Sequence, residues 1–179
     1  MEERNEKVSP NSTPESNDAN IDNTKQDKGS RSKVEGGRGS GKLLVVIRIA
    51  GMVKVKGDIA DTLDRLRLRR KYACVLVDSG DGAIMGMLEK VKFYVAYGSI
   101  DKETLVELVK ARGQGVGGEV DAEKVVGGLM NGKGLKELGL KPFFRLHPPR
   151  KGIKSKLQYP KGVLGDNKDD INKLLRRML

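Results

Sequence analysis

Two short apolar runs stand out along the chain, and both have the length of a β-strand. Residues 43–49 read Leu-Leu-Val-Val-Ile-Arg-Ile, and residues 72–77 form a similar run around Cys74. Neither run shows the polar alternation that a strand with one solvated face requires. We therefore predict two buried strands, the first of them in the centre of a sheet. Residues 93–97 alternate more clearly and predict a third, half-buried strand.

Helical periodicity fills the intervals between these strands. After a turn at Gly57, Asp58 is a candidate N-cap, and Ile59, Leu63 and Leu66 follow at the spacing of one helix face. A second face is formed by Ile84, Met87, Leu88 and Val91. The order is β-α-β-α-β. Because a helix between two neighbouring strands makes a parallel crossover, we predict a parallel sheet with both helices on one face and the other face open for a partner.

The second half of the chain shows weaker patterns. Helices are predicted after Asp101 and after Asp121, residues 141–165 are rich in Pro and Lys without periodicity, and a final helix carries Ile171, Leu174, Leu175 and Met178. The predicted fold class is α+β, a β-α-β-α-β core with additions. The predicted divisions are a disordered N-terminal arm (1–42), the core (43–98), a helical lobe (99–140) and a basic C-terminal extension (141–179).

The charge of the chain indicates a polyanionic partner. The formal net charge is +11, and the first 42 residues hold eight basic and eight acidic side chains, so the whole excess belongs to the remainder. Residues 141–179 hold eleven basic and three acidic residues. We expect such a segment not to pack comfortably against itself.

Several classes of function are disfavoured by the same sequence. One cysteine and one histidine allow neither an internal disulfide framework nor a multi-ligand metal centre, and there is no Ser/His/acid or Cys/His arrangement. No apolar stretch reaches the roughly 20 residues that span a bilayer, and no secretory leader is recognisable. We predict a cytoplasmic protein with no catalytic residues, no cofactor, no bound metal, no small-molecule substrate and no membrane partner.

Two glycine-rich stretches imitate nucleotide-binding loops. Residues 113–118 fit G-x-G-x-x-G, but they follow a predicted helix instead of a strand, so a bent loop that touches RNA is the better interpretation. Residues 127–133 end in Lys133, and the next residue is Gly134, where a phosphate-binding loop needs Ser or Thr.

Two basic clusters favour RNA as the partner. Residues 65–71 carry five cations and no acid, and a segment that starts at Lys141 combines Arg and Lys with proline and aromatic residues. In that segment Phe143 and Phe144 are expected mainly to pack onto the domain. The predicted RNA-binding residues are Arg48, Lys54, Lys56, Arg65, Arg67, Arg69, Arg70, Lys71, Lys133, Arg145, His147, Arg150, Lys151, Lys154 and Lys156.

An ordered set of short motifs resembles a known family. The sequence is similar to large-subunit ribosomal proteins of the L-thirty family, archaeal and eukaryotic long type, over residues 43–160, with matches at 43–48, 62–68, 86–92, 97–98, 112–113, 131–135 and 144–150. The resemblance implies a ferredoxin-like core, no enzymatic activity and a place among rRNA helices of the large ribosomal subunit. It also implies neighbouring ribosomal proteins and, as a further candidate, 5S rRNA. The long neutral N-terminal arm and the turn at 79–82 depart from the family pattern.

Two other classes of function fit parts of the sequence. A free-standing RNA-recognition module would show stacking aromatics with a glycine-rich signature on adjacent strands, and only Phe93 and Tyr97 are present. A small phosphotransfer enzyme would need an arginine and an asparagine around a phosphate, and the sequence offers Arg48 without an evident partner. Comigration with ribosomes distinguishes the first alternative, and detectable turnover would favour the second.

Overall fold

The computed structural model describes residues 41–116 and 121–179, and these residues fall within one compact unit. The core elements are β1 (Leu43–Arg48), α1 (Gly57–Arg65), β2 (Ala73–Asp78), α2 (Gly82–Val91) and β3 (Val95–Ser99). The additions are listed in chain order: α3 (Lys102–Arg112), α4 (Ala122–Met130), β4 (Phe144–Arg145), β5 (Gly165–Asp166), a 3-10 turn η1 (Lys168–Asp170) and α5 (Ile171–Arg176). The described ranges include no helix that is long and apolar enough to cross a membrane.

The sheet is mixed, with strand order β4-β2-β1-β3-β5. The predicted central position of β1 is confirmed, but the predicted parallel pairing of β1 with β2 is wrong, because β1 is antiparallel to both β2 and β3. The chain leaves β1, forms α1, and re-enters the sheet at the same end, where the Tyr72 N–H donates to the Arg48 carbonyl at 2.7 Å. Only α2 connects two strands of like direction, with β1 between them. This split β-α-β arrangement is that of ferredoxin-like folds, and the α+β class is as predicted.

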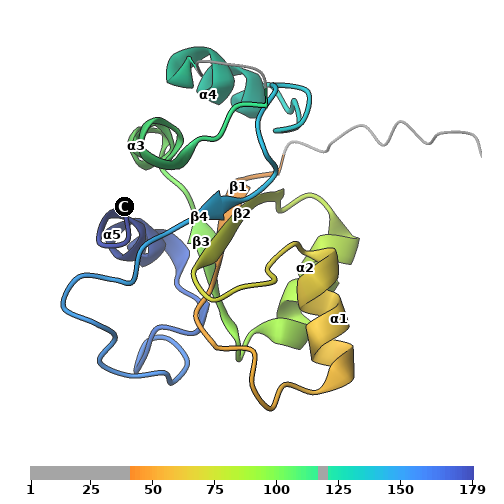
Figure 1. The fold of residues 1–179 in the computed structure, drawn as a ribbon, viewed down its shortest axis with the longest axis vertical. Coiled ribbons are helices and arrows are strands. Elements are labelled where there is room, and N and C mark those ends of the chain that lie inside the picture. The colour runs from red at the N-terminus through yellow and green to blue at the C-terminus, as the bar shows by residue number, and fades with distance from the viewer. Residues whose placement is uncertain (1–40, 117–120) are drawn as a thin grey trace, which may run out of the picture. The chain divides into compact units, whose positions relative to one another are not determined.

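Helices α1 and α2 cover one face of the sheet, as predicted (Figure 1). Their Leu63, Leu66, Leu88 and Val91 pack against the strand residues that point to this side, among them Val46. The predicted cap is two residues late, because α1 has Lys56 as its N-cap and Asp58 lies in its first turn. At α2 the Asp81 carboxylate accepts from the Ala83 and Ile84 amides and caps the helix.

The opposite face is not open, contrary to the prediction. Val45, Ile47, Ile49, Cys74 and Ala96 point to this side. They form one cluster with buried residues of α3, α4 and α5, listed here by helix: Leu105, Leu108 and Val109; Val125, Val126 and Leu129; Ile171, Leu174 and Leu175. Figure 1 shows these three helices on the side away from α1 and α2. The sheet is therefore enclosed on both faces, and a partner must bind the rim or the helices.

The third strand also differs from the half-buried strand that was predicted. It begins at Val95, and its first four residues are all buried because both sheet faces are covered. Phe93 lies before the strand with 59% of its surface exposed. The alternation of apolar and polar residues in the sequence therefore falls mainly on the turn before the strand, and not on the strand itself.

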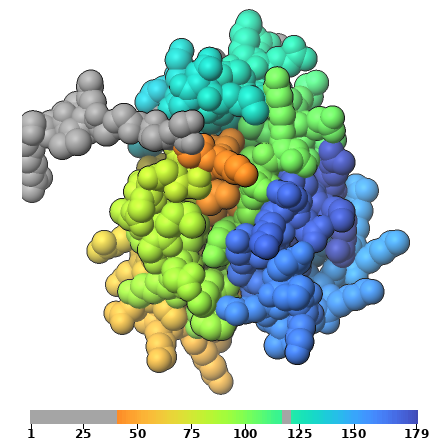
Figure 2. Space-filling model, turned by 180° about the vertical axis from the view of Figure 1, so that it is seen from behind, coloured from red at the N-terminus to blue at the C-terminus, as the bar shows by residue number. Residues whose placement is uncertain are grey.

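The basic C-terminal segment is integrated into the domain instead of standing apart from it. Its β4 pairs with β2 and its β5 pairs with β3, so the segment closes both edges of the sheet. The helix that follows has the buried residues predicted from its spacing. In Figure 2 this segment, in blue, forms a continuous part of one face of the molecule. Its buried apolar residues, among them Leu146, Leu164 and Ile171, belong to one cluster with residues of the domain body, so the positive charge of the segment does not keep it from packing there.

Candidate nucleic-acid interface

The end of α1 directs a run of cations outward. Leu66 and Leu68 are 6% and 0% exposed, respectively, and between and after them Arg65, Arg67 and Arg69 are exposed. Because the leucines are fixed in the core, the alternating arginines must face solvent. Arg67 has a left-handed backbone (φ 60°), which ends the helix and turns the chain toward β2.

Arg48 does not belong to this surface, and its predicted RNA-binding role is wrong. The residue is 4% exposed. Its guanidinium donates to the carbonyls of Leu68 at 2.6 Å, Arg69 at 3.1 Å, Gly51 at 2.8 Å and Ala50 at 3.1 Å. Burial lowers the pKa of Arg48, partly opposed by Asp64. The side chain instead joins the loop after β1 to the segment before β2 and so positions Arg69.

Six cations converge around a hollow beside α1 and β4, which we call the basic hollow. Its volume is about 770 Å³. The cations are Arg65, Arg67, Arg69, Arg70, Lys71 and Arg145, and the other lining residues are Asp64, Tyr72, Ala73, Pro142, Phe143 and Leu146. The one acid, Asp64, is 3.5 Å from Arg69 in an exposed pair, which contributes little to holding either side chain. The six cations are exposed and the five apolar lining residues are buried or half-buried, so we call the cations the rim of the hollow and the apolar residues its floor.

A larger groove of about 1,440 Å³ adjoins it on the other side of the same arginines. Arg65 and Arg67 line this groove together with Lys133 from the loop after α4, and with Lys42 and Lys136. Asp78, Asp81 and Glu137 also line it, so its charge is mixed. Lys133 thus lies in the same groove as Arg65 and Arg67.

The remaining predicted cations of the C-terminal extension lie elsewhere. We call residues 146–164 the C-terminal loop; its His147, Arg150, Lys151, Lys154 and Lys156 are exposed and line neither hollow nor groove. The beginning of the loop is fixed to the end of α5. The His147 N–H donates to the Met178 carbonyl, and the Arg177 guanidinium donates to the carbonyls of Arg150 and Gly152.

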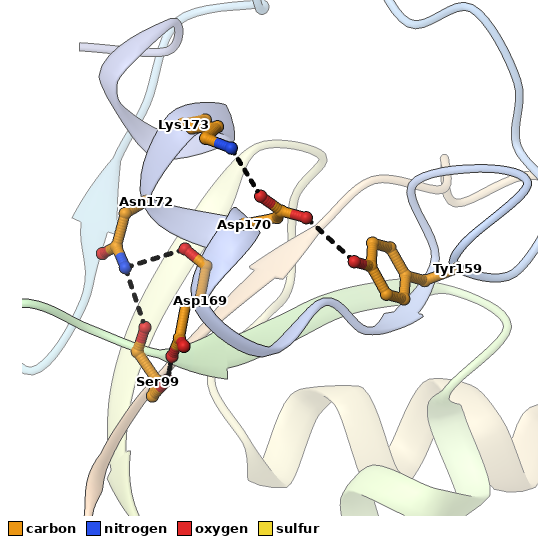
Figure 3. Close-up of polar contacts among 6 residues, drawn as sticks. All are labelled: Ser99, Tyr159, Asp169, Asp170, Asn172 and Lys173. Atoms are coloured by element: carbon orange, nitrogen blue, oxygen red, sulfur yellow. Dashed lines mark hydrogen bonds and ion pairs between the residues drawn. The ribbon is translucent and has the colours of Figure 1, made fainter.

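A polar network fixes the start of α5 to β3 (Figure 3). The buried Asn172 side chain donates to the Ser99 carbonyl at 3.1 Å and the Asp169 carbonyl at 3.0 Å, and it accepts from the Asp101 amide. The Ser99 hydroxyl also donates to the Asp169 carboxylate. These hydrogen bonds fix the position of the C-terminal helix without an ion pair.

Asp170 links that helix to the C-terminal loop. Lys173 and the Tyr159 hydroxyl both donate to its carboxylate at 2.8 Å. The bond from Lys173, and then that from Tyr159, lower the pKa of Asp170, and the pKa of Tyr159 is raised by the same bond. Farther along, Arg176 lies within 3.5 Å of Glu103 and 3.3 Å of Glu107 on α3. Part of the positive charge of residues 141–179 is thus paired with acidic side chains within the domain.

Lys54 and Lys56 lie in a third position, in the loop that enters α1. Both are exposed, and none of the ion pairs found between described residues involves them. Arg48 connects this loop, through Gly51, to the carbonyl of Arg69. The loop is therefore close to the basic cluster in space although it precedes α1 in sequence.

The lining residues Tyr72 and Phe143 were not predicted as site residues. Tyr72 was assigned to a buried strand, and Phe143 mainly to packing, which is confirmed because Phe143 packs against the cluster of α1 and α2. Their positions in the sequence could have indicated their role in lining the hollow, because Tyr72 directly follows the basic run and Phe143 alternates with Arg145. Phe144, which points the other way, is 1% exposed, and its predicted packing role is confirmed.

The remaining predictions concern residues outside the basic hollow and the groove. Cys74 is fully buried, as its predicted packing role requires, and burial raises the pKa of its thiol. The predicted N-terminal arm, apart from Gly41 and Lys42, lies outside the described residues. The same holds for Gly117 and Gly118 of the G-x-G-x-x-G stretch.

A split β-α-β sheet covered on both faces, with cations gathered at one end of α1, defines a ferredoxin-like α+β domain whose surface suits a polyanion. Residues 44–95 match the family model described as Ribosomal protein L30p/L7e. The chain is 42% identical over 152 residues to the large ribosomal subunit protein uL30 of Archaeoglobus fulgidus, covering 76% of this chain and 99% of that protein.

Other archaeal relatives agree. The large ribosomal subunit protein uL30 of Methanococcus vannielii is 43% identical over 155 residues, covering 75% of this chain and 97% of that protein. The protein of the same name from Desulfurococcus amylolyticus is 36% identical over 160 residues, covering 77% and 99%. The chain therefore belongs to the ribosomal protein L30p/L7e family.

Proposed function

We propose that this protein is a structural constituent of the large ribosomal subunit that binds and stabilises rRNA, and that it acts without catalysis. The observation that carries the proposal is the convergence of six cations with one acid around the basic hollow. A cluster of this kind neutralises closely spaced phosphates and releases their counterions. Membership of a ribosomal protein family supports rRNA as the polyanion and the ribosome as the location.

The contacts to rRNA are proposed for two regions that differ in geometry. The first consists of Arg65, Arg67, Arg69, Arg70 and Lys71 with Arg145 and Lys133. The second consists of Lys54, Lys56, His147, Arg150, Lys151, Lys154 and Lys156, which are exposed in the two loops described above. Neighbouring ribosomal proteins are further proposed partners. A surface of dispersed cations suits a protein held between several RNA helices.

Salt-dependent binding of the purified full chain to large-subunit rRNA tests the proposal. Replacement of Arg69, Arg70 and Lys71 by alanine is expected to weaken binding and to flatten the dependence of log affinity on log salt by roughly 0.7 to 0.9 per lost phosphate contact. Replacement of Lys102, Lys110 and Lys124, which are exposed on α3 and α4, is the control of equal charge. An identical slope for both variants would contradict the proposal.

The nearest RNA can be identified in the same assembly. We propose that 5S rRNA, in addition to the large rRNA, is a candidate neighbour. Crosslinking of assembled subunits followed by sequencing of the attached RNA distinguishes the two. Adducts confined to the large rRNA would remove 5S rRNA from the proposal and leave the structural role unchanged.

A further inference from the structure

The floor of the basic hollow has a composition that phosphate binding alone does not require. Tyr72, Ala73, Pro142, Phe143 and Leu146 line it, and each of them is less exposed than the surrounding cations. A duplex backbone presents phosphates and sugars, and cations alone are sufficient to hold it. An apolar and aromatic floor under a cationic rim is instead the combination that accepts an unstacked base together with its phosphates.

Each of the two aromatic rings has a cation over one of its faces, at cation–π distance. The Lys71 ammonium lies 4.7 Å from the centroid of the Tyr72 ring, and the Arg145 guanidinium lies 6.0 Å from the centroid of the Phe143 ring. Phe143 and Arg145 share a side because side chains alternate along an extended segment, and buried Phe144 points the opposite way. A base that contacts either ring would have a positive group within reach of its own phosphate.

The hollow is held in shape by the backbone. Tyr72 adopts a left-handed conformation (φ 64°), which is uncommon for a bulky residue and needs support from its surroundings. That support is visible on both sides: its N–H donates to the Arg48 carbonyl at 2.7 Å, and its carbonyl accepts from the Leu146 amide at 3.0 Å. The next residue, Ala73, is paired with Arg145 in the β2–β4 ladder. The two rings are thus carried by two hydrogen-bonded segments, one leading into β2 and one into the edge strand β4, and are preorganised.

The size of the hollow fits the same ligand. About 770 Å³ lies within the range of roughly 300 to 1,000 Å³ that small-molecule sites occupy, and it is ample for one nucleotide. The Tyr72 hydroxyl makes no hydrogen bond to another described residue, so it is available to a polar base edge. Tyr72 packs partly against the core cluster on one face of the sheet and Phe143 partly against the cluster on the other face, and both residues remain half-exposed at the sheet edge.

We infer that the basic hollow is a subsite for a single unstacked RNA nucleotide, with its base against Tyr72 and Phe143 and its phosphates among the surrounding arginines. This inference rests on the proposed function and adds to it a preference for an extruded base over continuous duplex. The basic rim supplies affinity for any RNA, and the aromatic floor supplies the preference.

The test uses the full chain and an RNA hairpin with one bulged 2-aminopurine, compared with the same hairpin in which that purine is paired. The wild-type protein is expected to bind the bulged hairpin more tightly and to change its fluorescence. Tyr72→Leu and Phe143→Leu retain apolar volume but lose the stacking surface, so each is expected to weaken binding of the bulged hairpin by about tenfold. The salt slope should not change, because no cation is removed.

Phe93→Leu is the matched control. Phe93 is exposed and has a lysine 5.8 Å from its ring centroid, but it does not line the hollow. It should leave both affinities unchanged. Equal binding of the two hairpins by the wild type, or an undiminished preference in both leucine variants, would overturn the subsite. The variant that lacks Arg69, Arg70 and Lys71 separates the subsite from the proposed function. If this variant still loses affinity for RNA, only the subsite is overturned. If it does not, the proposed function is contradicted as well.

Crosslinking of the wild-type protein keeps the test decisive if a leucine variant fails to fold. A hairpin with 4-thiouridine at the bulge is irradiated, and the attached peptide is identified by mass spectrometry. Adducts at Tyr72 or within residues 142–146 support the subsite. Adducts only at other positions contradict it.

Discussion

The basic hollow and the C-terminal loop are both rich in cations, but their backbones present those cations differently. Around the hollow, the end of α1 and strand β4 converge, and six cations line one cavity. In the C-terminal loop, the predicted cations are spaced along an irregular chain whose start is fixed to α5 by Arg177 and by backbone bonds. The hollow is lined by six Lys and Arg residues and the loop carries five, so the spacing and arrangement of the cations, and not their number, distinguish the two regions.

The largest expected effect comes from the residue that supports the hollow without lining it. Arg48→Met should lower the free energy of unfolding by about 3 kcal/mol, because four carbonyls lose a charged, buried donor. Urea unfolding measures this change. Arg65→Ala, at an exposed position, is the control and should shift stability by less than about 0.5 kcal/mol. Wild-type stability of the Arg48 variant would mean that the hollow does not depend on this side chain.

The corresponding support for the C-terminal segment is Asn172. Asn172→Ala should cost about 1 kcal/mol, because it leaves the part-buried Asp101 amide and Ser99 carbonyl without their partner. Hydrogen exchange should increase in residues 165–179 more than in β1 and β2. Lys173→Ala, which removes an exposed pair from the same helix, is the comparison and should have little effect. Uniform acceleration across the whole sheet would contradict a local anchoring role.

RNA binding sharpens the contrast between the two cationic regions. Replacement of Lys151, Lys154 and Lys156 by alanine removes the same charge as replacement of Arg69, Arg70 and Lys71. We expect a smaller loss of affinity and a smaller change in salt slope from the loop variant, because its cations do not share one cavity. Filter binding to large-subunit rRNA at several salt concentrations measures both. Equal losses would erase the distinction between hollow and loop.

The smallest expected effect is electrostatic and lies in the network of Figure 3. The pKa of Asp170 is below its ordinary value, so this carboxylate stabilises the fold above an ordinary Asp pKa of about 3.9, and its contribution is lost as the pH falls through the lowered value. Lys173→Met should raise the pKa of Asp170 more than Tyr159→Phe does, following the order of their contributions. Carboxyl NMR titration reads this order directly, and the reverse order would refute it.

The sequence was a good guide to where elements lie and a poor guide to how strands pair. The runs at 43–49 and 72–77 and the spacing of Leu63, Leu66, Leu88 and Val91 place the core elements within about two residues, because burial imposes periodicity on each element locally. Pairing direction is not local. It depends on the long excursion between Arg48 and Tyr72, which returns the chain to the same end of the sheet. The apolar faces of α3 and α5 were recognised, but their packing on the sheet was not.

The candidate site shows the same division. Arginines at the end of α1 were found because they form a cluster in the sequence, whereas Arg48 was assigned to RNA although it sits among the buried residues of a central strand. A charged residue in such a strand must be satisfied internally, and this one is. Tyr72 and Phe143 were missed because they become neighbours of one hollow only through the pairing of β2 with β4. No pattern along the chain encodes that pairing.

We expect the protein to be a lasting structural part of the large ribosomal subunit. Sucrose-gradient sedimentation of a native lysate, at moderate and then high salt, with the chain followed by mass spectrometry across the fractions, tests this claim most directly. Comigration with the large subunit that persists at high salt is the expected result. Recovery of the protein at the top of the gradient under both conditions would contradict the claim and favour a free RNA-binding module.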